Sequence, residues 1–129
     1  MWPDPRFLLL KQRQWQNLQA QKQRTQMLAQ HQAHFEWLQQ EKSRLKREEA
    51  TLDTEKLHLE NERRRLELWD RSLGETPAQH EKDSFNSAVD GYNRRVAAFQ
   101  SSVNQHDHKI GIWKQEAERY NANRALQSR

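Results

Sequence analysis

The residues of this chain that could do chemistry are its six histidines and a row of glutamates. His31 and His34 are spaced to share one face of a helix, and His106 and His108 flank Asp107. Metal sites in helical bundles combine glutamates with Glu-x-x-His sets on facing helices. The sequence does not supply such sets on two helical segments. We therefore expect core or surface histidines, with no metal and no cofactor.

The glutamates Glu41, Glu48, Glu55 and Glu62 recur every seven residues. On a coiled coil this spacing is typical of the charged row beside the apolar seam, and not of an acid–base pair. The sequence also lacks a glycine-rich phosphate loop and a nucleophile elbow. We therefore expect a chain that is not an enzyme and has no catalytic residues. His106 falls in the predicted seam, where burial would disfavour its charged form and make helix pairing weakly pH-sensitive.

The composition excludes an ordinary globular core. Of 129 residues, 33% are hydrophobic and 31% are charged, and the mean hydropathy is -1.31. Globular domains are about 45–50% apolar, so the composition fits either disorder or long helices that bury one narrow stripe. The absence of cysteine excludes disulfides and thiolate chemistry. The longest apolar run, residues 7–10, is too short for a membrane span or a signal segment.

A seven-residue repeat begins at Phe85 and predicts a long helix. Its apolar residues alternate at spacings of four and three, which is the pattern of a coiled-coil seam with left-handed supercoiling. The first position of the repeat holds Phe85, Tyr92, Phe99, His106, Trp113 and Tyr120. The fifth position holds Val89, Val96, Val103, Ile110, Ala117 and Arg124.

An asparagine follows three of these aromatic residues, at Asn86, Asn93 and Asn121. Over about 45 residues, the segment resembles the tandem aromatic-Asn-x-x-Val heptads in coiled-coil regions of some bacterial, often envelope-associated, proteins. The asparagine is replaced at Gln100, Asp107 and Lys114. The resemblance implies a bacterial scaffold element and assigns no catalytic residue.

A second long helix is predicted before this repeat, because leucine recurs every seven residues. These leucines are Leu38, Leu45, Leu52, Leu59, Leu66 and Leu73. The companion seam position is weak, since most of its residues are charged: Phe35, Lys42, Glu49, Lys56, Arg63 and Asp70. Leu57, Leu68 and Trp69 lie off the leucine row and widen it.

Helix-ending and helix-starting residues meet between the two helices. Asp4 is expected to cap the first helix, ahead of Pro5. Gly74 is expected to end that helix in a left-handed conformation. Thr76 is expected to cap the second helix, with Gln79 completing a capping box. A stop and a start so close together predict a helical hairpin.

We therefore expect an all-α fold, an antiparallel coiled-coil hairpin of two long helices that forms a single unit over residues 1–129. The first helix is expected over 5–73, the turn over 74–77 and the second helix over 78–127. Folding at this turn sets the leucine row against the aromatic row. The expected pairs are Leu66 with Phe85, Leu59 with Tyr92, Leu52 with Phe99, Leu45 with His106, Leu38 with Trp113 and His31 with Tyr120.

The valine row of the second helix would face the charged side of the first helix. A second hairpin is expected to cover it, giving a homodimeric helical bundle. Pairing of continuous helices between two chains is left open, because β-branched residues in this row are also typical of parallel dimers. The seam residues of the prediction are Leu38, Leu45, Leu52, Leu59, Leu66, Phe85, Val89, Tyr92, Val96, Phe99, Val103, Ile110 and Trp113.

The N-terminal segment 5–24 would extend past the end of the second helix. It is rich in glutamine, and the chain has no acidic residue between Asp4 and Glu36. Exposed apolar side chains generally mark partner contacts. The partner-binding candidates are Phe7, Leu8, Leu10, Trp15 and Leu18.

These features favour a non-enzymatic structural or adaptor protein that assembles with itself and with a protein partner. Flagellar and type III export stalk proteins are similar in architecture, so a bacterial envelope or secretion-type complex is one setting. The bacterial cytoplasm and periplasm both stay open as locations. The alternative function is a nucleic-acid-binding coiled coil that uses the basic, glutamine-rich N-terminal end. A third interpretation places residues 5–20 on a membrane surface.

Overall fold

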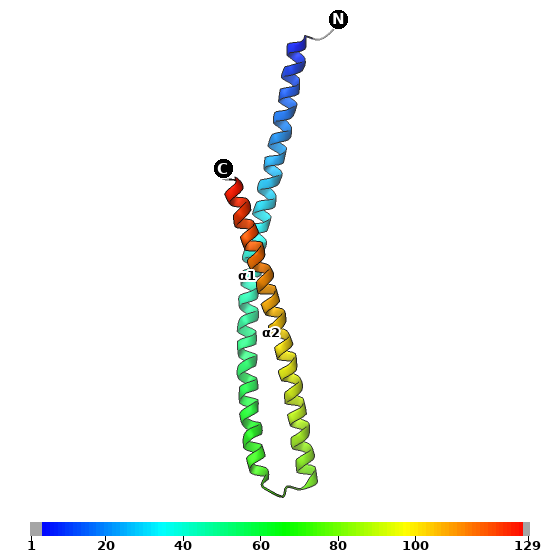
Figure 1. The fold of residues 1–129 in the computed structure, drawn as a ribbon, viewed down its shortest axis with the longest axis vertical. Helices are drawn as coiled ribbons and strands as arrows, with labels where there is room; N and C mark the ends of the chain where they lie inside the picture. The colour runs from blue at the N-terminus through cyan, green and yellow to red at the C-terminus, as the bar shows by residue number, and fades with distance from the viewer. Residues whose placement is uncertain (1–3, 128–129) are drawn as a thin grey trace. The chain divides into compact units, whose positions relative to one another are not determined.

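The computed structural model of the chain describes residues 4–127, and every regular element among them is an α-helix. Helix α1 spans Pro5–Leu73 and helix α2 spans Gln79–Gln127 (Figure 1). The two helices pack against each other as a hairpin, and residues 4–127 contain no strand. The prediction of an all-α fold with two packed helices is confirmed.

The chain forms two compact units. Unit 1 combines Met1–Gln40 with Ala117–Arg129, and unit 2 is the continuous stretch Glu41–Glu116. Unit 2 therefore holds the turn and the two helical arms that meet there (Figure 1). Unit 1 holds the N-terminal part of α1 together with the last turns of α2.

Gly74 ends α1 in the left-handed backbone conformation, with a φ of 73°. Glycine adopts this conformation without the steric cost that a Cβ brings, which is why it commonly follows the last residue of a helix. The predicted role of Gly74 is confirmed. The other end of α1 also agrees with its predicted cap, because Asp4 Oδ1 accepts a hydrogen bond from the Arg6 amide at 3.0 Å.

The start of α2 corrects the predicted capping box. The first helical bonds of α2 go to the carbonyl of Ala78, which accepts from the Glu81 amide at 3.1 Å. The cap position therefore falls at Ala78 and not at Thr76. The Gln79 amide group donates to Asp83 Oδ1 at 2.9 Å, one turn further along α2. Since it bonds forward, the Gln79 side chain does not close a box with Thr76.

A narrow apolar stripe joins the helices. Leu45 and Leu59 of unit 2 and Leu38 of unit 1 are buried, and all three belong to the heptad leucine row of α1. The α2 side of the stripe consists of half-buried aromatic and β-branched residues. Burying a large apolar side chain contributes about 1.5–3 kcal/mol. The stripe is thus the main source of free energy for the packing of the helices.

The companion row of α1 lies on the other side of the leucines from the predicted one. The predicted companion residues Phe35, Lys42, Glu49, Lys56, Arg63 and Asp70 are exposed. The residues three positions after the leucines, Glu41, Glu48 and Glu62, are half-buried instead. Two of these glutamates bond to basic side chains of α2, which compensates their partial loss of hydration.

Replacing Gly74 by alanine is expected to lower the free energy of unfolding by about 1 kcal/mol, because a Cβ is strained at this positive φ. The matched control is Gly111→Ala in α2, where an added Cβ meets nothing within 4 Å. This control is expected to gain about 1 kcal/mol from helix propensity. Urea unfolding followed by circular dichroism at one protein concentration measures both changes. A loss of stability in both variants would contradict the space found around Gly111.

Candidate functional site

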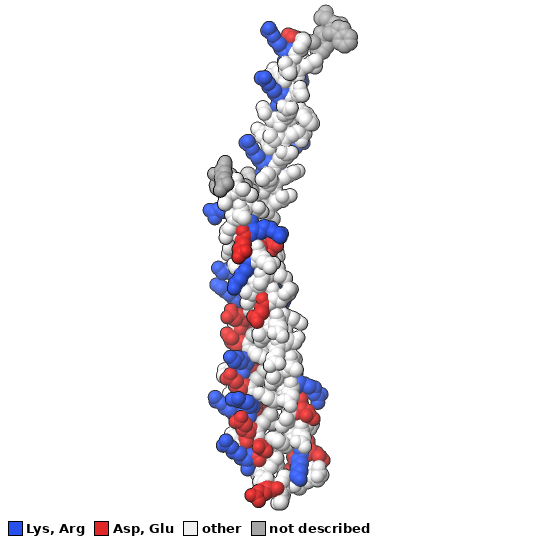
Figure 2. All heavy atoms as spheres, viewed as in Figure 1, with Lys and Arg blue, Asp and Glu red and all other residues white. Residues whose placement is uncertain are grey.

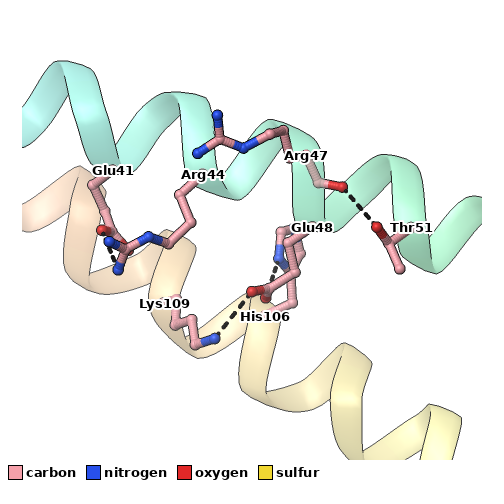
Figure 3. A network of polar contacts seen from close by, with 7 residues as sticks. All are labelled: Glu41, Arg44, Arg47, Glu48, Thr51, His106 and Lys109. Carbon is pink, nitrogen blue, oxygen red and sulfur yellow. Dashed lines mark hydrogen bonds and ion pairs between the residues drawn. The ribbon is translucent and has the colours of Figure 1, made fainter.

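A polar cluster connects the two helices of unit 2 and consists of Glu48 of α1 with His106 and Lys109 of α2 (Figure 3). We call it the His106 layer. Glu48 Oε1 lies 2.8 Å from His106 Nδ1, and Glu48 Oε2 lies 3.0 Å from Lys109 Nζ. His106 is only 5% exposed, whereas Glu48 and Lys109 retain contact with solvent. A buried histidine thus occupies a place that aromatic and aliphatic residues fill elsewhere in α2.

The carboxylate of Glu48 is the electrostatic centre of this layer. An ionised carboxylate can only accept hydrogen bonds, so Nδ1 of His106 carries the hydrogen of the shared bond. The hydrogen bond from His106 and then that from Lys109 hold the pKa of Glu48 below its ordinary value of 4.5, although partial burial opposes them. Nε2 of His106 is buried and has no hydrogen-bond partner within residues 4–127. Sliding one helix along the other would leave buried polar groups unpaired, so the layer favours one alignment.

The sequence placed His106 opposite Leu45 and assigned Glu48 to a charged row beside the seam. In the structure, His106 bonds to Glu48, which lies one turn beyond Leu45 on α1. Glu48 shares its position three residues after a seam leucine with Glu41, Glu55 and Glu62, so its contact with His106 depends on the facing helix. Sequence reasoning missed the part played by Lys109.

Two other polar contacts near the layer lie within α1. Arg44 forms an ion pair with Glu41 at 3.3 Å, and the Thr51 hydroxyl donates to the Arg47 carbonyl at 3.1 Å (Figure 3). Both are contacts between neighbouring turns of one helix, so they do not bridge the helices. Contacts of this kind between neighbouring turns contribute a few tenths of a kcal/mol.

A second bridge in unit 2 joins Glu62 of α1 to Arg95 of α2. Arg95 Nε donates to Glu62 Oε2 at 3.1 Å, and Arg95 Nη2 donates to Glu62 Oε1. A Cβ added at Gly91 would lie 3.4 Å from Arg95 Nη1, which is an ordinary contact distance, so the bridge does not require glycine there. The two-pronged contact is the geometry in which arginine binds carboxylate most specifically. Glu62 and Glu48 therefore play the same part at two levels of the hairpin.

Unit 1 contains an aromatic cluster around Tyr120. Its ring stacks on His31 with centroids 4.2 Å apart and an interplanar angle of 15°, which confirms the predicted pairing. Tyr120 also contacts His34 edge-on at 5.7 Å and Phe35 at 5.8 Å. An open hollow beside the cluster is lined by Met27, Gln30, His31, His34, Asn123 and Leu126. The two histidines predicted to share a helix face therefore both pack on one tyrosine.

The residues of the predicted seam are buried or half-buried. Leu38, Leu45 and Leu59 are buried, and the remaining members are half-buried: Leu52, Leu66, Phe85, Val89, Tyr92, Val96, Phe99, Val103, Ile110 and Trp113. Near the turn, the ring of Trp69 meets Phe85 edge-on at 5.4 Å. Trp69 therefore belongs to the packing near the turn.

The partner-binding candidates are on the exposed N-terminal part of α1. Their exposed fractions are similar and large: Phe7 51%, Leu8 52%, Leu10 55%, Trp15 62% and Leu18 50%. Lys11 Nζ approaches the Phe7 ring at 5.5 Å in a cation–π contact. Figure 2 shows basic side chains along this segment, whereas acidic and basic side chains are interspersed over unit 2. The candidates stay a prediction.

Residues 4–127 contain no group of three or more His, Asp or Glu side chains arranged to hold a metal ion. Neither helix, over its described length, has a stretch long and apolar enough to cross a bilayer.

No family model matches this sequence, and it matches no curated protein and no solved structure. The resemblance to aromatic-Asn-x-x-Val heptads therefore stays an expectation.

Glu48→Gln is expected to lower the free energy of unfolding at pH 7 by about 1 kcal/mol, because charge-assisted hydrogen bonds are lost. The lowered pKa of Glu48 means that its contribution is complete above pH 4.5 and disappears as the pH falls through the lowered value. The variant should therefore lose less stability than the natural chain between pH 7 and pH 3. Chemical unfolding at several pH values and one protein concentration measures this difference.

The neighbouring substitution Glu49→Gln is the matched control, because it removes the same charge at an exposed position. It should change the unfolding free energy by less than about 0.5 kcal/mol, as is usual for exposed sites. Identical pH profiles for the natural chain and Glu48→Gln would rule out the assigned role of Glu48.

Proposed function

We propose that this chain is a non-enzymatic structural or adaptor protein. It forms an antiparallel coiled-coil hairpin that pairs with a second copy into a dimeric helical bundle. It presents the N-terminal end of α1 to a protein partner within a bacterial envelope or secretion-type assembly.

The observation that carries this proposal is the small amount of apolar burial within one chain. Among the described residues, the buried apolar side chains are Leu38, Leu45 and Leu59. The chain exposes 11116 Å², whereas a folded monomer of its mass exposes about 7,200 Å². The excess surface supports a molecule that functions in contact with other chains.

The valine row of α2 supports self-association along the hairpin. Val89, Val96, Val103 and Ile110 are half-buried, while the α1 residues nearest the leucine row are glutamates. One helix thus offers two apolar rows and the other offers one. A second hairpin could cover the valine row with its own, which is the arrangement of four-helix bundles.

The N-terminal end supports contact with a different protein. Its apolar side chains are more than half exposed at Phe7, Trp15 and Leu10. Isolated helices of this length are marginal in water. Contact with a partner would remove apolar surface from water and stabilise the segment.

Light scattering on the full chain and on a chain that begins at Arg24 tests whether dimerisation and partner contact use different parts of the molecule. Both are expected to have twice the mass of the single chain, which is 15.6 kDa for the full sequence. Dimerisation would then run along the hairpin. A monomeric truncated chain would instead make the N-terminal segment the dimerisation device and would remove the main support for its role in partner contact.

Val96→Glu is expected to weaken the dimer by at least about tenfold, because a carboxylate would be placed in the valine row without a partner. Ala97→Glu is the matched control, because it adds the same charge at an exposed position one residue away. Sedimentation velocity over a concentration series measures the dimer constants, and circular dichroism checks that both variants remain helical. Equal dimer constants would contradict association through the valine row.

The alternative function is nucleic-acid binding by the N-terminal end. It is favoured by five exposed basic residues without an acidic neighbour between Asp4 and Glu36: Arg6, Lys11, Arg13, Lys22 and Arg24. Binding to phosphates releases counterions, so affinity for a DNA duplex should then fall steeply with salt. An absence of binding at low salt would exclude this alternative.

A further inference from the structure

The side of α1 that faces α2 in unit 1 is defined by Tyr120. Its ring stacks on His31 at 4.2 Å and lies 5.8 Å from Phe35. α2 ends at Gln127, seven residues beyond Tyr120. In the same alignment, the α1 residue at the level of Gln127 lies seven residues before His31, and it is Arg24. Arg24 therefore marks the level at which α2 ends.

Helical geometry carries this side of α1 further toward its N-terminus. A residue turns about 100° around the helix axis, so a step of seven or of eleven residues returns to within about 20° of the starting direction. Arg24 lies seven residues before His31, Arg13 eleven before Arg24, and Arg6 seven before Arg13. The three arginines therefore continue the α2-facing side of α1 past the end of α2. All three are exposed.

Apolar side chains flank the arginines at both ends of this stretch. Leu9 and Met27 are eighteen residues apart, as are Leu10 and Leu28, and eighteen residues make five turns of an α-helix. Each pair thus points in one direction, on either side of the arginine line. Their exposed fractions are 55% for Leu9, 51% for Met27, 55% for Leu10 and 64% for Leu28. We call the three arginines with these four residues the basic strip.

The charge of the segment limits what can cover the strip. Residues 5–35 contain no Asp or Glu, and Figure 2 shows basic side chains along the start of α1. The same segment of a second copy would set arginines against arginines, which costs free energy. An acidic helix with apolar residues beside its carboxylates complements both features of the strip.

We propose that the basic strip binds an acidic amphipathic helix of a partner protein, which continues along α1 from the level at which α2 ends. This inference rests on the proposed contact of the N-terminal segment with a protein partner, and it specifies the chemistry of that partner. Of the candidates Phe7, Leu8, Leu10, Trp15 and Leu18, the strip uses only Leu10. The others point to the remaining sides of the helix.

The test compares two pairs of charge reversals in the full chain. Arg13→Glu with Arg24→Glu changes the strip, whereas Lys11→Glu with Lys22→Glu changes the charge equally on nearly the opposite side of α1. Both pairs are eleven residues apart and all four residues are exposed. The matched control therefore has the same net charge as the test variant and changes lysines on the other face of the helix instead of arginines.

The probe is a fluorescent helical peptide of three heptads, with leucine in its seam and glutamate beside the seam. Fluorescence anisotropy at low salt measures its affinity for the natural chain and for both double variants. The arginine variant is expected to bind at least about tenfold more weakly, since it sets carboxylates against carboxylates, and the lysine variant less than about threefold more weakly. Circular dichroism confirms that both variants stay helical.

Three results would overturn the proposal: no binding of the acidic peptide by the natural chain at low salt, equal losses in the two variants, or tighter binding to a 20-base-pair DNA duplex than to the peptide. The last result would assign the segment to nucleic acid. Light scattering on the same samples separates these failures from a failure of the proposed function. If the chain is a dimer that does not bind the peptide, the proposal for the basic strip alone is wrong. If the chain is a monomer, the proposed helical bundle is wrong.

Discussion

The packing of one leucine row on α1 against two rows on α2 constrains the whole molecule. Only 33% of the residues are hydrophobic, so little apolar surface is available beyond these rows. The leucines at Leu38, Leu45 and Leu59 become buried, whereas the wider α2 stripe remains half-buried. Because the α2 stripe is wider than the leucine row, part of it packs against polar residues of α1. The α1 residues beside the leucines must be polar, and yet they lie against another helix.

At two levels of the hairpin, a glutamate three residues after a leucine packs against α2 and accepts hydrogen bonds from it. Glu48 accepts hydrogen bonds from His106 and Lys109, and Glu62 accepts them from Arg95. Partly exposed ion pairs contribute little to stability by themselves, about 0–1 kcal/mol. Their larger effect is to destabilise other alignments of the two helices, because a misaligned pair would bury His106 without the Glu48 carboxylate. The apolar rows thus provide attraction, and the polar bridges select the alignment.

Periodicity in the sequence predicted the parts of the fold that depend on one helix at a time. The seven-residue leucine row and the aromatic row each identify a helix, and Gly74 marks the end of the first helix through its need for a positive φ. The capping box at Thr76 was wrong, because the Gln79 side chain chooses between two nearby partners and bonds to Asp83. Such a choice depends on small free-energy differences that a residue pattern does not contain.

The polar bridges were harder to predict because they depend on the facing helix. Glu48 and Glu55 occupy equivalent positions in the heptad, yet Glu48 is half-buried and Glu55 is exposed. The difference arises from α2, which presents His106 and Lys109 to Glu48. A single row of glutamates therefore contains both structural and solvated members. Only the alignment of the two helices distinguishes them.

The order of the bridges along the hairpin also has a kinetic consequence. The residues joined by the Glu62–Arg95 bridge are 33 positions apart in the chain, and those joined by the Glu48–His106 contact are 58 apart. The entropy cost of closing a loop grows only with the logarithm of its length, so the second contact costs about 0.5 kcal/mol more than the first. Once the turn at Gly74 has formed, each further contact closes a short additional stretch of chain. We therefore expect unit 2 to fold from its turn outward and to form the His106 layer late, with the search for contacts kept local in a chain with two long helices.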